Sequence, residues 1–277
     1  MSFDVATVGD NCIDQYLPPI DCSLVGGNAL NVAVNLRRHG HTVRYVGMVG
    51  NDPDGRTVMA AARAAGLDVS EVEIGAGTTG VTTIRLGPEG EREFVAESLG
   101  TSAGYVPPPA VVRRLATSDW VHCATLPDDT AWLAGLAKRS VRLSYDFSHP
   151  ARATPMAALC PHLEVAFLSL PGGHREAGLK LAREAVGLGA RSAVVTLGAV
   201  GSIGVTARVS IHRQALEVDT VDTLGAGDAY IAGTVDALLA GADLDQAMSA
   251  GSADAAAACR HLGAWPQPLA SLDKEVS

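Results

Sequence analysis

Short apolar runs rich in β-branched residues alternate with segments of helical periodicity along most of this chain. The runs are Val5–Val8, Val43–Val49, Trp120–Ala124, Val141–Phe147, Val165–Leu168 and Ala193–Leu197. The helical segments are Ala29–Arg38, Gly55–Ala65, Ala131–Lys138, Arg175–Leu188 and, after a glycine-rich stretch, Ala229–Ala240. Fully buried parallel strands read as continuous apolar runs, and alternation of strands with helices is typical of a sheet covered on both faces. We therefore predict an α/β fold with a mostly parallel sheet.

The composition limits the kind of partner that this chain can have. A length of 277 residues suits one large α/β domain, and the net charge of −9 comes from scattered acids, which disfavours nucleic-acid or anionic-membrane binding. Five widely spaced cysteines without a C-x-x-C pair predict neither a zinc site nor a disulfide framework. No apolar run approaches the length of a membrane span, and no basic leader precedes the first strand. We expect a reduced, cytoplasmic protein.

One region breaks the alternation of strands and helices. Val81–Leu86 and Glu91–Ala96 have strand-like patterns and are joined by Gly87-Pro88-Glu89-Gly90, a turn signal. We predict a β-hairpin that lies outside the main sheet. Such an excursion fits a lid that excludes water from an active site, and it equally fits an exposed decorative hairpin.

The segment Asp222-Thr223-Leu224-Gly225-Ala226-Gly227-Asp228 directly precedes the last of these helical segments. Its small residues allow main-chain N–H groups to converge at a helix start, where the helix dipole also favours an anion such as phosphate. Asp228 would repel a phosphate beside it, so we interpret it as a general base that accepts a proton from an attacking hydroxyl. In the alternative interpretation the glycines shape a turn and Asp228 caps the helix. A side chain added at Gly225 or Gly227 should displace the phosphate.

A second glycine pair, Gly26-Gly27, opens a helix whose first turn presents Asn28 and Asn31 on one face. Amide side chains both donate and accept hydrogen bonds, which suits sugar hydroxyls, although a tight turn with asparagine caps explains the same pattern.

Two acids, Asp10 and Asp14, follow the first strand, where the carboxyl ends of strands line the ligand crevice of open α/β sheets. The turn Gly47–Gly55 is assigned a structural role, with Asp52 or Asp54 capping the next helix. Thr196-Leu197-Gly198-Ala199-Val200-Gly201 also follows a strand, and it fits either a path beneath a nucleotide ribose or a simple turn.

The histidines have no metal-ligand spacing, and His122, His149 and His174 are interpreted as structural or exposed.

In order, the motifs G-x-x-x-x-D, G-G-N-x-x-N, G-x-x-G-x-D-x-x-G, T-L-G-x-x-G-S and D-T-x-G-A-G-D resemble those of the PfkB (ribokinase-like) carbohydrate kinases over nearly the whole chain. The resemblance implies one kinase domain over residues 1–277 with a three-layer Rossmann-like core. It also implies a small β-lid built from about 12–24 and 75–104, through which two chains would clasp as a homodimer. ATP would be the phosphoryl donor, with Mg²⁺ and a monovalent cation such as K⁺, and a sugar would be the acceptor.

The same resemblance distributes roles over the motifs. Asp228 would be the base, and Gly225, Ala226 and Gly227 would form the anion hole. A monovalent cation would lie at Asp222. The substrate contacts would be Asp14, Gly26, Gly27, Asn28, Asn31 and Asp228, with Asp10 added as a partner for a cationic amine. The nucleotide contacts would be Thr196, Gly198, Gly201, Thr223, Gly225 and Gly227.

Within the family, Gly9–Tyr16, Gly26–Val34 and His261–Trp265 most resemble the fructoselysine 6-kinases, which implies phosphorylation of a sugar amine at its 6-hydroxyl. Two family patterns are missing. Leu168–Gly173 lacks the N-x-x-E that organises Mg²⁺, and Asp146-Phe147-Ser148 replaces D-x-N, so we assign no magnesium ligand. A kinase for fructose, ribose, a keto-deoxy sugar or a nucleoside is an alternative, and so is a non-catalytic sensor. Acidic sugars are less favoured, because cations near the crevice come only from hairpin residues such as Arg85 or Arg92.

Overall fold

The computed structural model describes the chain except for residues 88–89, 127–129, 149–155, 269 and 272–277. In the described part a nine-stranded sheet forms the centre of the molecule. Its strands, in spatial order, are β13 (Ser210–Arg213), β12 (Ser202–Thr206), β11 (Ser192–Thr196), β10 (Val165–Ser169), β9 (Arg142–Asp146), β8 (Trp120–Ala124), β1 (Asp4–Gly9), β4 (Thr42–Gly50) and β5 (Asp68–Gly75). Strands β11 to β5 pair in parallel, while β12 and β13 extend one edge antiparallel.

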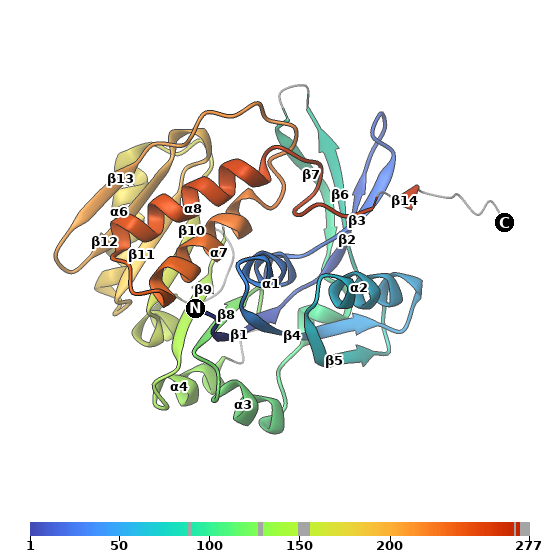
Figure 1. Cartoon of the computed structure of the whole chain (residues 1–277), viewed down its shortest axis with the longest axis horizontal. Helices are drawn as coiled ribbons and strands as arrows, with labels where there is room; N and C mark the ends of the chain where they lie inside the picture. Colours follow the sequence, from blue (N-terminus) through green and yellow to red (C-terminus); the bar gives the residue numbers. More distant parts are fainter. Residues whose placement is uncertain (88–89, 127–129, 149–155, 269, 272–277) are drawn as a thin grey trace.

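Helices cover both faces of this sheet and make three layers (Figure 1). One face carries α1 (Asn28–Arg38), α2 (Pro53–Ala64), α7 (Ala226–Leu239) and α8 (Leu244–Ala258). The other carries α3 (Pro109–Leu115), α4 (Ala131–Ala137), α5 (Met156–Leu159) and α6 (Arg175–Gly187). Short 3-10 turns lie at η1 (Gly100–Gly104), η2 (Cys160–His162) and η3 (Gly198–Val200).

Alternate residues of each central strand enter opposite cores. On β10, Val165 and Phe167 belong to the core beneath α1 and α7, whereas Ala166 and Leu168 belong to the core beneath α4 and α6. Successive side chains of a strand point to opposite faces, so a strand buried on both sides needs an unbroken apolar run. This explains why the strand segments could be read directly from the sequence, and it confirms the predicted α/β class.

A second sheet stands beside the first and contains five strands of the described chain. In order they are β14 (Ala270–Ser271), β3 (Cys22–Gly26), β2 (Cys12–Tyr16), β6 (Gly80–Leu86) and β7 (Arg92–Ser98). The predicted hairpin is therefore present as the antiparallel pair β6–β7, outside the main sheet. Segments 12–24 and 75–104 both contribute to this sheet, and their action as a lid stays a prediction.

The second sheet packs against the glycine-rich segment that precedes α7. Tyr16, Cys22, Leu24 and Ile84 form a small core with Leu224. Strand β1 leads into β2, and β3 leads into α1, so the chain leaves the main sheet at the carboxyl end of β1 and returns as a helix on its face. Among the described helices, none combines the length and apolar character needed to cross a membrane.

The structure also shows where the polar residues Asp52 and His122 lie, for which the sequence predicted structural roles. Asp52 caps α2 by accepting a hydrogen bond from Gly55 N at 2.7 Å, as its position before the helix predicted. His122 is fully buried on β8, where its Nδ1 lies 2.9 Å from Ser144 Oγ, and burial lowers its pKa to about 3. Its role is therefore structural. His149 lies outside the described residues.

Candidate active site

Helix α7 begins at the glycine-rich segment, and Gly225 is its N-cap residue in the left-handed conformation, with φ 73°. A Cβ at Gly225 would lie 2.4 Å from the Ala264 Cβ, whereas a Cβ at Gly227 would enter open space. This corrects the expectation that side chains at both positions would displace a phosphate, because position 225 faces the protein interior. The open space at Gly227, above the first turn of α7, fits a bound anion.

Asp228 lies in the first turn of α7 and does not cap the helix, since no side chain caps this helix start. Its Oδ2 instead accepts a hydrogen bond of 2.6 Å from Asn31 Nδ2, on the first turns of α1. The structure therefore joins the predicted base to a predicted sugar-binding residue almost 200 positions earlier in the chain.

Burial raises the pKa of Asp228 to about 8, and the carboxyl groups of Asp146 and Asp10 add to the effect. The Asn31 hydrogen bond and the charge of Arg92 act in the opposite direction. A carboxylate whose pKa lies near the working pH is suited to accept a proton from an alcohol.

The start of α1 is held by Asp10, which follows β1. Its two carboxylate oxygens accept hydrogen bonds from Asn28 N at 3.0 Å and Ala29 N at 3.3 Å. These are N–H groups that a helix start leaves unsatisfied, and the helix dipole favours a negative charge there. The structure thus shows Asp10 in a helix-anchoring role, and its predicted contact with substrate stays a prediction.

Asp146, at the carboxyl end of β9, joins this group of residues. Its Oδ2 accepts a hydrogen bond from Asn28 Nδ2, and its Oδ1 accepts one from Ser148 N at 2.8 Å. Burial raises the pKa values of both Asp146 and Asp10. The ends of two parallel strands therefore place two carboxyl groups beside the first turn of α1.

The two glycines before α1 are explained by close contacts. A Cβ at Gly26 would lie 1.8 Å from Asp14 Oδ2, and a Cβ at Gly27 would lie 2.4 Å from the Asn11 Cα, with Gly27 at φ 109°. Asp14 is nearly inaccessible, and its Oδ1 accepts a 3.3 Å hydrogen bond from the Cys12 thiol. Burial raises the pKa of Asp14 to about 7, while Arg92 opposes the shift. The glycines make room for Asp14 at the base of the site.

Several buried acceptor atoms of this site have no hydrogen-bond partner among the residues that the structure describes. They are Asp14 Oδ2, Asn28 Oδ1, Asn31 Oδ1 and Asn11 Oδ1. The amide nitrogens of Asn28 and Asn31 both face carboxylates, which fixes the orientation of these amides and leaves their oxygens free. Buried acceptors are almost always satisfied, so this set indicates a ligand that brings several donors.

Asp222 is completely buried, and its carboxylate is already surrounded by donors. Oδ2 accepts from the Tyr16 hydroxyl at 2.5 Å and from Gly263 N at 2.9 Å, and Oδ1 accepts from Leu224 N at 2.8 Å. These bonds join β2 of the second sheet to the segment before α7. The donors occupy most of the lone pairs of this carboxylate, so the side chain of Asp222 is poorly placed to ligate a cation.

Thr223 is hydrogen-bonded to residues of the β6–β7 hairpin. Its N–H donates to Gly90 O at 3.1 Å, its carbonyl oxygen accepts from Arg92 Nη1, and its hydroxyl lies 3.2 Å from the same nitrogen. Arg92 Nε is buried and has no hydrogen-bond partner in the described part of the chain. The charge of Arg92 lowers the pKa values of Asp14 and Asp228, so this guanidinium lies at the border of the site.

Of the predicted nucleotide residues, Thr196 ends strand β11, Gly198 begins η3 and Gly201 directly follows η3. Gly201, at φ 107°, packs directly on the main chain of Arg213, where a Cβ would meet Arg213 O at 2.0 Å. Next to it is a hollow of about 470 Å³ lined by Arg175, His212, Arg213, Gln214, Leu216, Ser249 and Ser252. A larger hollow of about 980 Å³ is lined by Ile13 and Gln15 of β2 and contains none of the predicted site residues.

Asp146 and Arg92 also border the candidate site. Asp146 was not predicted as a site residue, and Arg92 was named only as a hairpin cation near the crevice. Asp146 was noted only as a departure from a family pattern, although its place at a strand end next to Asp10 was a usable signal. Arg92 lies in an exposed-looking strand, and nothing in the sequence indicates that this strand reaches Thr223.

Comparison with known proteins agrees with this geometry. Residues 23–269 match the model of the pfkB family carbohydrate kinases. The chain is 35% identical to a fructoselysine 6-kinase of Shigella flexneri over 94% of this chain and 99% of the relative, and 31% identical to a fructosamine kinase of Bacillus subtilis over 93% and 91%.

The fold is similar to that of an Arabidopsis thaliana ribokinase solved with ribose and ATP. The TM-score is 0.80 at 19% identity, covering 95% of both chains. This likeness confirms the predicted ribokinase-like fold.

Proposed function

Because the chain belongs to the pfkB family of carbohydrate kinases, we propose that it transfers the γ-phosphoryl group of ATP to the 6-hydroxyl of fructoselysine or a related fructosamine. The two relatives named above act on fructoselysine and fructosamine by their names, and they match this chain over almost its whole length. The fold neighbour with ribose and ATP supports ATP as the donor.

One observation carries this proposal: Asp228 and Asn31 meet at 2.6 Å beside buried acceptors for which the described chain offers no hydrogen-bond partner. A sugar offers several hydroxyl donors at once, which the free oxygens of Asp14, Asn28 and Asn31 require. The acceptor hydroxyl would lie against Asp228 and below the open space at Gly227.

The proposed reaction follows from these positions. The sugar oxygen forms a bond to the γ-phosphorus, the bond from that phosphorus to the leaving ADP oxygen breaks, and the hydroxyl proton passes to the Asp228 carboxylate. The Gly227 N–H holds the charge on the transferring group, with help from the α7 dipole, whereas the Ala226 N–H donates to Thr223 O at 3.3 Å. The nucleotide would extend toward Thr196, Gly198, Gly201 and Thr223, with the hollow at Arg213 and Ser249 beyond them.

The charge of the site supports an amine-bearing acceptor. Burial raises the pKa values of Asp10, Asp14, Asp146 and Asp228 together, because four carboxyl groups share a region with little water. The secondary ammonium of a fructosamine would compensate this charge, whereas fructose or ribose would not. This distinction favours fructoselysine over the neutral alternatives.

Magnesium supplies charge neutralisation on the nucleotide phosphates when it is bound. Among the described residues no group of three His, Cys, Asp or Glu side chains is arranged to hold one metal ion, so we place no protein ligand on Mg²⁺ and derive no step through it. The donors around Asp222 argue against a direct ligand role for this side chain toward K⁺. Comparing turnover in potassium and tetramethylammonium salts tests the predicted monovalent-cation dependence.

We further propose that two chains associate through the second sheet, which would serve as a lid on the site. Strand β7 is the edge of this sheet and exposes Phe94 and Val95 to 52% and 44%. Exposed apolar edge strands invite pairing with another chain, and a second copy would cover them. We place the enzyme in the cytoplasm, in keeping with five cysteines that carry no disulfide in the described chain.

A single assay tests the function. ADP release is measured with fructoselysine, fructose, ribose, a keto-deoxy sugar and a nucleoside as acceptors, and the product position is read by phosphorus–proton NMR. We expect the highest kcat/KM with fructoselysine and phosphate on the 6-oxygen. Preference for a neutral sugar would overturn the acceptor assignment. Sugar binding by calorimetry without ATP consumption for any acceptor would instead identify a sensor.

A further inference from the structure

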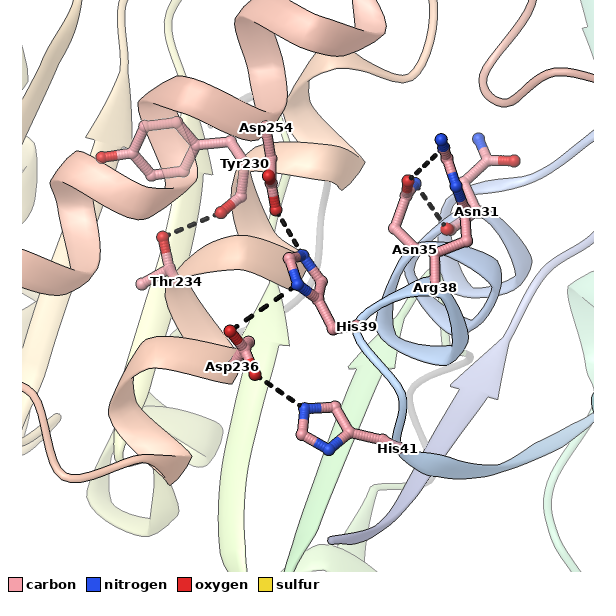
Figure 2. Close-up of polar contacts among 9 residues, drawn as sticks. All are labelled: Asn31, Asn35, Arg38, His39, His41, Tyr230, Thr234, Asp236 and Asp254. Atoms are coloured by element: carbon pink, nitrogen blue, oxygen red, sulfur yellow. Dashed lines mark hydrogen bonds and ion pairs between the residues drawn. The ribbon is translucent and has the colours of Figure 1, made fainter. Parts of the chain in front are cut away.

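Helices α1 and α7 meet a second time near their carboxyl ends, where Figure 2 shows His39 and His41 beside Asp236. His39, the C-cap residue of α1, places its ring between two carboxylates. Its Nε2 lies 2.5 Å from Asp254 Oδ2 on α8, and its Nδ1 lies 3.6 Å from Asp236 Oδ2 on α7. One imidazole ring therefore connects three helices.

The register of the two contacts shows how they are related. His39 follows Asn31 by the same number of residues as Asp236 follows Asp228. The helices therefore run parallel and in register, with the Asn31–Asp228 hydrogen bond near one end and the His39–Asp236 contact about 12 Å further along. Rotation or sliding of α7 against α1 would break both contacts together.

The protonation of this cluster follows from its hydrogen bonds. His41 is buried, its Nδ1 accepts from Phe3 N at 3.3 Å, and its Nε2 lies 3.0 Å from Asp236 Oδ1. A neutral His41 protonated at Nε2 satisfies both contacts. His39 instead faces an acceptor at each nitrogen, so both contacts are made only by the imidazolium, which also suits a helix carboxyl end.

The hydrogen bond with Asp254 raises the pKa of His39 above its ordinary value, and the charges of Asp254 and Asp236 act in the same direction. Burial and the nearby Arg38 oppose the shift. Arg38 and His261 line the same small hollow as His39 and Asp254.

We propose that the His39 imidazolium is a positioning residue for catalysis, which fixes α7 and α8 against α1 so that Asn31 keeps its hydrogen bond to Asp228. The inference rests on the proposed role of Asp228 as general base. Two further contacts stiffen the path between the ends: Asn35 Nδ2 donates to Asn31 O at 2.9 Å, and Thr234 Oγ1 donates to Tyr230 O at 2.8 Å (Figure 2). Asp254 also lies directly on Gly233, where a Cβ would be 2.4 Å from its Oδ2.

This role has a signature that loss of stability alone does not produce. The Asn31 hydrogen bond lowers the pKa of Asp228, so a variant that weakens this bond raises the pH at which the base becomes active. The acid limb of the kcat/KM profile should then move to higher pH. A variant that only destabilises the fold lowers the melting temperature and leaves the limb in place.

The test compares kcat/KM profiles for the sugar between pH 6 and 10, at saturating MgATP, in His39→Gln and Asp254→Asn. Both variants should move the acid limb upward by about half a pH unit, the size expected for weakening one hydrogen bond. Asp254→Asn removes the charged partner on α8 and leaves His39 itself unchanged. It therefore tests the same proposal if His39→Gln does not fold. Arg114→Gln is the matched control, because it removes the 2.6 Å ion pair with Glu71 between α3 and β5. Its limb should not move.

A double-variant cycle sharpens the result. Asn31→Ala should move the limb by itself, and adding His39→Gln should move it little further, because both changes act on the same bond. Additive shifts of the acid limb in the double variant would overturn the positioning role. So would an acid limb that does not move in His39→Gln and Asp254→Asn. In either case an inactive Asp228→Asn variant would leave the proposed function unaffected. Full turnover in Asp228→Asn would overturn both.

Discussion

Arg92 on β7 donates hydrogen bonds to the carbonyl oxygen and the hydroxyl of Thr223, at the entrance to helix α7. Since the Thr223 N–H also donates to Gly90 O, the hairpin holds this residue at both its donor and its acceptor groups. The position of the second sheet is thereby linked to the position of the α7 helix start. A shift of the hairpin would be transmitted to the residues that we propose to face the phosphate.

Arg92→Met should lower kcat/KM for the sugar by at least about 10-fold, because a hydrogen bond from a charged group commonly contributes more than 1.5 kcal/mol. Arg85→Met is the control, since Arg85 pairs with Glu93 on the exposed side of the same hairpin at 2.6 Å. Its steady-state kinetics should match the unmodified enzyme. Equal kinetics for the two variants would contradict the link to Thr223.

Asp228→Asn should lower kcat by about 10²- to 10⁴-fold, the usual contribution of a general base, with sugar binding retained. The same variant should melt at higher temperature at pH 8. The pKa of Asp228 is raised from about 4 in the unfolded chain to about 8 in the fold, so the carboxyl group destabilises the fold increasingly as pH rises through this range. Removing it should raise the melting temperature at pH 8 by at least a few degrees in calorimetry. A lower melting temperature at pH 8 would contradict the raised pKa.

Activity should rise with pH on the acid side. A base with a pKa of about 8 is mostly protonated at neutral pH, so kcat/KM should increase up to about pH 8 and then level off. Binding of a cationic sugar amine lowers this pKa, and the limb of kcat should therefore lie at lower pH than that of kcat/KM. Coincident limbs in both profiles would argue against a cation beside Asp228. Rates measured with fructoselysine and with fructose provide the comparison.

The two glycines of the helix start should respond differently to alanine. Gly225→Ala places a Cβ 2.4 Å from the Ala264 Cβ at a left-handed residue, so we expect a loss of about 1–3 kcal/mol in the free energy of unfolding. Gly227→Ala meets no protein atom and should leave urea denaturation unchanged while raising the KM for ATP. Normal ATP kinetics in Gly227→Ala would show that the phosphate lies elsewhere.

We expect Asp10 and Asp14 to have different roles: Asp10 stabilises the start of α1, and Asp14 determines the preference for fructoselysine over fructose. Asp10→Asn weakens the bonds to Asn28 N and Ala29 N, and a capping loss of about 1 kcal/mol should appear in thermal denaturation. Asp14→Asn keeps the size of the side chain but removes a negative charge whose Oδ2 is free. It should reduce the ratio of kcat/KM for fructoselysine over fructose about 10-fold. An unchanged ratio in Asp14→Asn would assign the selection to another carboxylate.

Patterns of neighbouring residues were enough to predict the central strands, the cap of α2 and the start of α7. The central strands are unbroken apolar runs, Asp52 precedes Pro53 at a helix start, and the glycine-rich segment leads directly into α7. Strand β12 was missed although most of its residues are buried, because Ser202 and Gly204 interrupt its apolar run. Strand β13 was missed because it is a short, polar edge strand without a buried run.

In the candidate site, too, the sequence predicted individual residues but not the contacts between them. Asp228 and Asn31 were each predicted from neighbouring residues, but their contact depends on how α1 and α7 pack. Asp146 and Arg92 enter the site from other elements, and such pairings are set by the tertiary fold. For the same reason the anchoring role of Asp10 became visible only when its two oxygens were seen on the α1 main chain.

Strand β14 has a practical consequence for handling the enzyme. Ala270 and Ser271 pair with β3, and the Gln267 amide binds both main-chain groups of Val25, so these last described residues are fastened to the second sheet. Met1 is fully exposed on another part of the molecule (Figure 1). A purification tag, or the attachment point for a biosensor surface, should therefore be placed at the amino end, where it does not disturb the pairing of β14 with β3.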